Sequence, residues 1–402
     1  MPETLIRREH YLRILHRLKD KPIVKIITGV RGCGKSALVE MFISDLKKGG
    51  ISERNILYMD LEERENSGIK YGDTLLMKVE EAVELKKGTY LFFEGIQNIT
   101  DWEKAVSVMR YSGADIYITG SNAKLFTPGL SVHLSEEYAE VGVYPLSFRE
   151  YVDFMGRNGD RDQLLQEYMA VGGMPQAVFE GDTETNGSIP SAIFEKVFIR
   201  DVVEKNRIMD VAVIRDIAEF VMKNVGNTTS SRNISDHIAS KGGKITPPTA
   251  DSYLDHLESA YLLYRARKYD TETEEYLRTA NKFYSSDLGI RNKIAGYESD
   301  DTSGLIDNIV FMELLFRGKK AAVGKVGNNK VDFVVIGSTQ NEYYQVTTGL
   351  FDPDVLEKEV RPLKGIDDGS PRTIITLQRY TSRDIGGIKV VSLTDFLLEE
   401  FE

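Results

Sequence analysis

The residues from 28 to 36 place the strongest constraint on what this chain can fold into. They read Thr-Gly-Val-Arg-Gly-Cys-Gly-Lys-Ser and lie between an apolar run at 23–27 and a helix-like segment at 37–43. Strand, glycine-rich loop and helix, with the spacing G-x-x-x-x-G-K-S, form the context of a phosphate-binding loop, whose backbone N–H groups turn inward around a polyphosphate. The helix that follows adds the positive end of its dipole. We therefore predict a P-loop that binds ATP.

The residues of this loop have distinct expected roles. Lys35 is expected to reach the terminal phosphates, and Ser36 is expected to bind Mg²⁺ through its hydroxyl. The predicted nucleotide-binding residues are Gly29, Val30, Arg31, Gly32, Cys33, Gly34, Lys35, Ser36 and Ala37. Because Cys33 is the single cysteine, no intramolecular disulfide is possible, and a reducing compartment is expected.

Length and composition describe a protein of several domains. A chain of 402 residues is too long for one ordinary core, and its 41% apolar and 28% charged residues are typical of a soluble globular protein. There is neither an apolar stretch of membrane-spanning length nor a signal-peptide apolar region near the start, so we expect a cytoplasmic protein without a membrane partner. The net charge of −11 repels nucleic acid, so DNA binding would require a local basic patch.

Strands and helices alternate after the loop. Predicted strands cover 56–61, 90–93 and 115–119, and predicted helices cover 74–85 and 102–111. This alternation predicts an α/β fold with a parallel sheet and a ligand site at the carboxyl ends of its strands. Glu94 ends one strand and is the expected acid for Mg²⁺. Ser121 and Asn122 form a turn after the next strand, where they are placed to hydrogen-bond the γ-phosphate or the attacking water, and Asn122 is the expected γ-phosphate sensor. A plain turn is the alternative interpretation at Asn122. The predicted catalytic residues are Lys35, Glu94 and Asn122.

Several segments together resemble a known family. They are residues 29–36, 90–98, 118–122, 143–150, 172–175, 282–291 and 330–334. They are similar to the prokaryotic AAA-type ATPases in which a P-loop domain is followed by a winged helix and a restriction-nuclease-like domain. The resemblance spans almost the whole chain. It implies a P-loop NTPase parallel sheet over 1–145, a helical lid and winged-helix region over 146–295, and an α/β restriction-nuclease-like domain over 296–402.

Two departures from this family fall on catalytic positions. Where the family usually carries Asp-Glu, this chain has Glu94-Gly95, so the acid that orients the attacking water is missing. Where the family usually carries an arginine, this chain has Glu137, which would repel the γ-phosphate. Loss of an arginine finger can reduce turnover by about 10³-fold or more. We therefore expect ATP binding with slow or absent hydrolysis.

The middle region begins with a predicted capping box at Ser147 and Glu150. Helices predicted at 211–225, 231–240 and 247–263, with a hairpin between 265–269 and 275–278, indicate a winged helix. Its would-be recognition helix is acidic and carries Asp251, Asp255 and Glu258, while the cations near it, such as Arg265, are scattered. DNA binding by this module is therefore not favoured over a structural or protein-docking role.

The C-terminal region has part of a nuclease site. Glu313 on a predicted helix and Asp332 on a predicted strand occupy two acid positions, but the third position reads Gln345-Val346-Thr347, without the acid or the lysine. Without these groups little would ionise the attacking water, so an inactive scaffold is favoured.

Three functions remain open on the sequence. The first is an ATP-binding AAA-type protein that holds Mg-ATP between its P-loop domain and its lid, hydrolyses it slowly and couples the nucleotide state to rearrangement of the C-terminal domains. The second is a nucleotide-gated interaction protein without turnover. The third, less favoured, is an ATP-dependent DNA-processing nuclease. The expected cofactors are ATP and Mg²⁺, and the expected partner is a protein, with DNA possible but not favoured.

Overall fold

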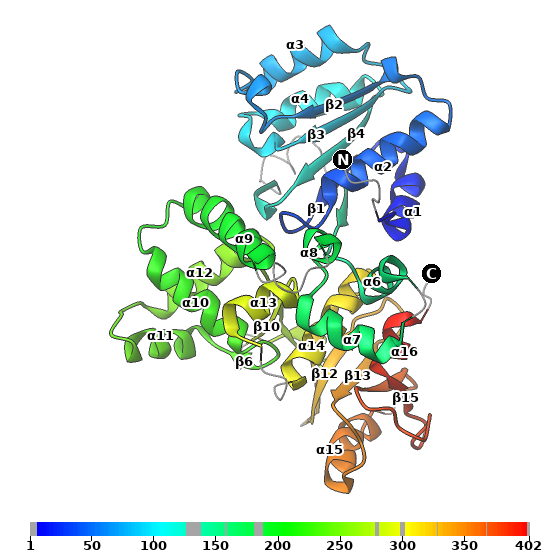
Figure 1. Ribbon diagram of the computed structural model, residues 1–402, viewed down its shortest axis with the longest axis vertical. Helices are drawn as coiled ribbons and strands as arrows, with labels where there is room; N and C mark the ends of the chain where they lie inside the picture. The colour runs from blue at the N-terminus through cyan, green and yellow to red at the C-terminus, as the bar shows by residue number, and fades with distance from the viewer. Residues whose placement is uncertain are drawn as a thin grey trace. The chain divides into compact units, whose positions relative to one another are not determined.

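A computed structural model describes residues 6–125, 138–156, 159–180, 188–277, 281–297, 302–327, 329–366 and 368–399 (Figure 1). The chain divides into two compact units. The first comprises residues 1–143 with 259–261, and the second comprises 144–258 with 262–402. No helix among the described residues is long and apolar enough to cross a membrane.

A parallel sheet of five strands forms the centre of the first unit, in the order β2-β3-β4-β1-β5 (Figure 1). The strands are β1 Val24–Thr28, β2 Ile56–Asp60, β3 Tyr90–Glu94, β4 Asp115–Gly120 and β5 Tyr138–Gly142. The strands predicted at 56–61, 90–93 and 115–119 are thus confirmed to within one residue at each end. Because all neighbouring pairs are parallel, the carboxyl ends of the strands meet at one edge of the sheet.

Helices cover both faces of this sheet. They are α1 Glu9–Leu18, α2 Lys35–Lys48, α3 Gly72–Ala82 and α4 Trp102–Tyr111. One face packs against α3 and α4 through a core that includes Phe93 of β3 and Val106 of α4. On the other face, the ring of Phe42 in α2 lies 5.2 Å from the ring of Tyr117 in β4. Burial on both faces explains the nearly unbroken apolar strands of this unit and holds the strand ends in place.

The second unit begins with helices and contains others along its length. They are α6 Phe148–Met155, α7 Arg161–Val171, α8 Pro175–Glu180, α9 Ser188–Val197 with the π-helical segment η5 Phe198–Glu204, α10 Val211–Lys223, α11 Ser231–Ser240, α12 Pro247–Ser259, α13 Leu288–Ala295, α14 Thr302–Phe316, α15 Pro353–Lys364 and α16 Leu393–Leu398. The first of them, α6, starts with the predicted capping box between Ser147 and Glu150.

Ser147→Ala is expected to lower the free energy of unfolding by about 1 kcal/mol. The backbone N–H of Glu150 donates to Ser147 Oγ at 3.3 Å, and the N–H of Ser147 donates to Glu150 Oε2 at 3.0 Å. The substitution removes the acceptor at a position that is only 6% exposed, where water is a poor replacement. Urea denaturation measures the change, and an unchanged unfolding midpoint would contradict the stabilising role of this cap.

Two sheets complete the second unit. The smaller is antiparallel, with β6 Thr228–Thr229, β10 Asn281–Ser285 and β7 Leu263–Ala266 in that order. The larger is mixed, in the order β15-β14-β13-β12-β11-β8-β9. Its strands are β8 Lys268–Asp270, β9 Glu275–Tyr276, β11 Ala321–Val326, β12 Asn329–Val335, β13 Glu342–Thr347, β14 Arg372–Thr376 and β15 Lys389–Ser392.

One detail of the predicted winged-helix region is wrong, and another is incomplete. The helix predicted over 247–263 ends at Ser259, and the left-handed conformation of Tyr261, with φ 56°, precedes the strand that starts at Leu263. The predicted hairpin forms with Tyr269 opposite Tyr276, but β8 also pairs with β11, which makes the hairpin part of the larger sheet. Local patterning does not reveal this, because the pairing of β8 with β11 joins segments that are far apart in the chain.

Candidate nucleotide-binding site

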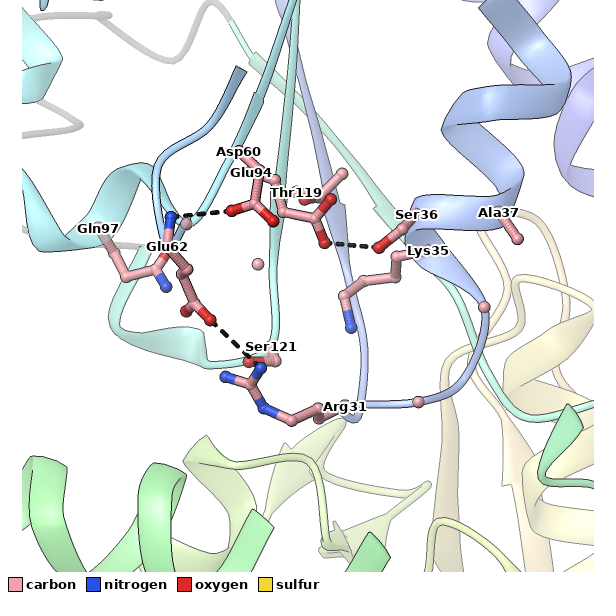
Figure 2. A pocket seen from close by; sticks show the side chains of 14 residues that line it. Arg31, Lys35, Ser36, Ala37, Asp60, Glu62, Glu94, Gln97, Thr119 and Ser121 are labelled. Carbon is pink, nitrogen blue, oxygen red and sulfur yellow. Dashed lines mark hydrogen bonds and ion pairs between the residues drawn. The ribbon is translucent and has the colours of Figure 1, made fainter. Parts of the chain in front are cut away.

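A pocket of about 250 Å³ opens at the carboxyl edge of the five-stranded sheet (Figure 2). The loop after β1 and the ends of β2, β3 and β4 all contribute to it. Its lining consists of Arg31, Gly32, Gly34, Lys35, Ser36, Ala37, Asp60, Glu62, Glu94, Gly95, Gln97, Thr119, Gly120 and Ser121. The pocket therefore lies where ligands bind in open parallel sheets.

Three residues of the predicted loop hold it in place and do not line the pocket. Gly29 has φ 142°, and a Cβ at this position would lie 2.0 Å from the backbone oxygen of Val143, so only glycine fits. The Sγ of Cys33 lies 3.2 Å from the same oxygen and donates to it. Val30 is fully buried. The single cysteine is thus a small buried residue that fastens the loop to the chain after β5.

Lys35 lies at the start of α2 and its amine reaches over the loop. Its Nζ donates to the carbonyl oxygens of Gly29 at 2.8 Å and Val30 at 3.0 Å. Hydrogen bonds from an ammonium group to charged phosphate oxygens are stronger than those to neutral carbonyl oxygens. Phosphates would therefore displace the two carbonyls as partners of Lys35. Arg8, which the sequence pattern does not single out, donates from Nη1 to the carbonyl oxygen of Cys33 at 3.1 Å and supports the loop from behind.

Ser36 and Glu94, the predicted magnesium ligands, are in contact (Figure 2). Ser36 Oγ donates to Glu94 Oε1 at 2.5 Å, and the hydroxyl of Tyr58 donates to Glu94 Oε2 at 2.7 Å. A hydroxyl that gives its proton to a carboxylate keeps its lone pairs for a metal ion. Burial and the Glu94 carboxylate raise the pKa of Tyr58, so this phenol stays a donor at physiological pH. Hydroxyl and carboxylate oxygens suit Mg²⁺, which completes its shell with phosphate and water oxygens.

The pocket contains two carboxylates that the sequence pattern does not single out. Asp60 ends β2 and lies opposite Glu94 in the ladder between β2 and β3. Its Oδ1 accepts the backbone N–H of Glu62 at 2.8 Å, and Glu62 Oε2 lies 3.3 Å from Nη1 of Arg31 in the loop (Figure 2). The sequence signal that could have identified both is their position, with Asp60 at the end of β2 and Glu62 just after it, because β2 pairs with the strand of Glu94.

Of the predicted turn after β4, Ser121 lines the pocket, whereas Asn122 is fully buried and does not line it. Two other polar residues of the lining, Thr119 and Gln97, each have a buried side-chain oxygen without a hydrogen-bond partner in the described part of the chain. Unsatisfied polar atoms at a pocket favour a polar ligand or water. Glu137, which replaces the arginine of the resembled family, lies outside the described residues.

In the second unit, Glu313 does not join the predicted nuclease acids. Its Oε1 accepts from Nε of Arg317 at 2.7 Å, one turn along α14. The helix acid near Asp332 is Asp307, which lies on a different face of α14. The prediction for Glu313 is therefore wrong, because helix periodicity alone does not tell which face of α14 turns towards β12.

The ammonium of Lys282 in β10 lies between two acids, 3.0 Å from Asp307 and 3.5 Å from Asp332. Asp332 Oδ2 also accepts the N–H of Val346 at 3.1 Å, and the N–H of Asp332 donates to Gln345 Oε1 at 2.8 Å. Burial raises the pKa of Asp307, to about 7, against the opposing charge of Lys282. A lysine thus occupies the place between the two carboxylates.

The acidic helix α12 is paired with a cation of its own unit. Nη2 of Arg265 lies 2.7 Å from Asp255 Oδ1 and also contacts Glu258. Burial raises the pKa of Glu258, to about 7, although Arg265 opposes this shift. One of the scattered cations that the sequence places near this helix is therefore engaged by acids.

A comparison with known protein families finds an AAA domain in the part of the chain that holds this pocket. Residues 21–152 match the family model of the AAA domain, and residues 162–301 match a domain of unknown function, DUF8612. An uncharacterized protein of Haemophilus influenzae is 33% identical over 406 residues, covering 99% of this chain and 100% of that protein. An uncharacterized protein of Methanocaldococcus jannaschii is 26% identical over 364 residues, covering 85% of this chain and 79% of that protein.

Among solved structures, the Walker-type ATPase PABY2304 of Pyrococcus abyssi matches with a TM-score of 0.51 and 16% identity, over 73% of this chain and 97% of that one. At this identity the likeness shows the fold alone. Together with the AAA match and the parallel sheet, it identifies the first unit as an AAA-type P-loop fold.

Proposed function

Since the chain belongs to the family of the Haemophilus influenzae protein and carries an AAA domain over residues 21–152, we propose that it binds Mg-ATP and hydrolyses it slowly. The observation that carries this proposal is the meeting of Lys35, Ser36 and Glu94 in one pocket at the carboxyl edge of the sheet. The loop residues that line the pocket, which are Arg31, Gly32 and Gly34 to Ala37, would surround the phosphates, with the first turn of α2 directed at them.

Charge explains why the nucleotide would enter with its metal ion. The pocket lining contains three carboxylates and two cations, so its formal charge is −1 before a polyanion enters. Mg²⁺ bound through Ser36 and Glu94 would offset this excess and supply positive charge at the phosphates. Lys35 would neutralise a further phosphate charge, and Asn122, or the pocket-lining Ser121 beside it, would sense the γ-phosphate.

We propose that the nucleotide state acts on the second unit. Helices α10, α11 and α12 followed by β7 and β10 support a winged helix, and the large sheet with α14 supports a restriction-nuclease-like domain, with domain limits near 145 and 295. Lys282 between Asp307 and Asp332 leaves this domain poorly suited to hold a catalytic metal. A scaffold that docks a protein partner is therefore favoured over a DNA-processing nuclease.

A second candidate is a nucleotide-gated interaction protein that binds ATP without turnover. Gly95 favours it, because glycine at this position cannot orient the attacking water. This candidate shares the binding pocket with the first and differs from it only in hydrolysis.

The test is ATP affinity and steady-state phosphate release, measured in one preparation of the full chain with Lys35→Ala as the control. Binding that requires Mg²⁺, with phosphate release lost in the control, is the expected result. Binding without release in the wild type would favour the second candidate. No binding of ATP in the presence of Mg²⁺ would overturn both.

A further inference from the structure

We propose that Glu62 supplies the water-activating carboxylate that Gly95 cannot. The water-activating acid then comes from the segment after strand β2 and not from the end of the neighbouring strand β3. This inference rests on the proposed ATPase function and assigns its missing catalytic residue.

The space around Gly95 carries the inference. Gly95 follows β3 with φ 74°, and a Cβ at this position would lie 2.6 Å from Cγ and 3.5 Å from Cδ of Glu62. A contact of 2.6 Å is too short for any side chain to coexist with Glu62 as it stands. The side chain of Glu62 therefore occupies the volume beside position 95: its Cγ lies where a side chain of residue 95 would begin, and its carboxyl carbon lies in contact with that space. With no side chain at Gly95, Glu62 can occupy this space without shifting.

Glu62 is also held in this position. The backbone N–H of Glu62 donates to Asp60 Oδ1 at 2.8 Å, and Asp60 is fixed at the end of β2 by its pairing opposite Glu94. The side chain of Glu62 is 24% exposed and its Oε2 lies 3.3 Å from Arg31 of the P-loop. The carboxylate is thus attached to the sheet on one side and directed to the phosphate-binding loop on the other (Figure 2).

The other two carboxylates of the pocket are committed elsewhere. Glu94 accepts from Ser36 on one oxygen and from Tyr58 on the other, the arrangement of a metal-holding acid. Asp60 uses Oδ1 to hold the backbone of Glu62 and is a positioning residue. Glu62 is the carboxylate of this lining that faces the phosphate-binding loop, with Oε2 3.3 Å from Arg31.

The proposed step is hydrolysis at the γ-phosphorus. A water oxygen bonds to the γ-phosphorus while the bond from this phosphorus to the β,γ-bridging oxygen breaks, and ADP leaves with the electron pair. Glu62 orients the water and accepts its proton, which passes to solvent afterwards. A carboxylate in this role contributes about 10²- to 10⁴-fold to the rate.

Glu62→Gln in the full chain tests the assignment. We expect kcat for phosphate release to fall about 100-fold or more, with the dissociation constant for Mg-ATP within about 3-fold of wild type, because the amide keeps the size and loses the base. The matched control is Glu63→Gln, which removes the same charge from the adjacent, exposed residue that does not line the pocket. ATP affinity by titration with a fluorescent nucleotide is the readout independent of turnover.

A double variant that places the acid at position 95 gives a second test. In Glu62→Gly combined with Gly95→Asp, the shorter residue 62 clears the space and aspartate tolerates a positive φ. Recovery of phosphate release above Glu62→Gly alone would support the inference.

The outcomes separate this inference from the proposed function. Wild-type turnover that persists in Glu62→Gln would overturn the role of Glu62 and leave the ATPase standing. Tight binding without wild-type turnover would overturn the role of Glu62 and leave nucleotide binding standing. No binding of Mg-ATP would overturn both.

Discussion

Ser36→Ala is expected to weaken Mg-ATP binding by about 100-fold, to the affinity that the wild type shows for ATP in EDTA. Ser36 Oγ donates to Glu94 at 2.5 Å, which turns the oxygen lone pairs of the hydroxyl towards the pocket. Alanine removes this metal ligand and leaves the Glu94 oxygen without a donor. Without the metal contact the phosphates lose the positive charge that offsets them, and the expected 100-fold change in affinity corresponds to about 2.7 kcal/mol.

Titration of wild type and variant with ATP, in Mg²⁺ and in EDTA, measures this effect. The conservative control is Ser36→Thr, because the P-loop pattern accepts either hydroxyl, and we expect it to bind as the wild type does. Equal dependence on Mg²⁺ in Ser36→Ala and the wild type would show that the metal is held without Ser36, which would contradict the geometry at Glu94.

Lys282→Met is expected to lower the free energy of unfolding by about 3–5 kcal/mol at pH 8.5. Lys282 is 4% exposed and its ammonium lies 3.0 Å from Asp307 and 3.5 Å from Asp332. Methionine fills much of the same volume but removes the cation between the two carboxylates, while the charge of Lys330 still acts on both. The cost arises because ionised groups in an apolar interior lose their hydration without a partner in exchange.

The size of this loss is expected to depend on pH. Burial raises the pKa of Asp307 to about 7, so the folded chain binds this proton more tightly than the unfolded chain does. The contribution of Asp307 to stability therefore falls as pH rises towards 7, and without Lys282 the pKa rises further. Protonation at pH 5.5 should relieve most of the deficit of Lys282→Met.

Urea denaturation at pH 5.5 and 8.5 measures this difference. Lys293→Met, which replaces an exposed lysine of α13, serves as the control at each pH and accounts for the acid sensitivity of the rest of the chain. A destabilisation of the same size at both pH values would mean that lost packing, and not the unpaired carboxylates, causes the effect.

Short-range sequence patterns are enough to predict the P-loop and the sheet that presents it. The P-loop pattern consists of Gly29, Gly34, Lys35 and Ser36 between an apolar run and a helix. All of these residues are close together in the chain, so the pattern can be recognised in the sequence alone. The apolar strands that end near Glu94 and Gly120 follow from burial on both faces of a parallel sheet. The meeting of Ser36 with Glu94 is then a consequence of parallel strands sharing one carboxyl edge.

The partners of individual side chains depend on the tertiary structure. Glu62 lies beside Gly95 because β2 and β3 pair in one particular register, and Glu313 turns away from Asp332 because α14 presents Asp307 to Lys282. Hydrophobic periodicity specifies that a strand or helix is buried, but the register of a pair and the rotation of a helix are set by packing between distant segments. For this reason a missing acid at Gly95 is visible in the sequence, whereas the candidate that replaces it is visible only in the fold.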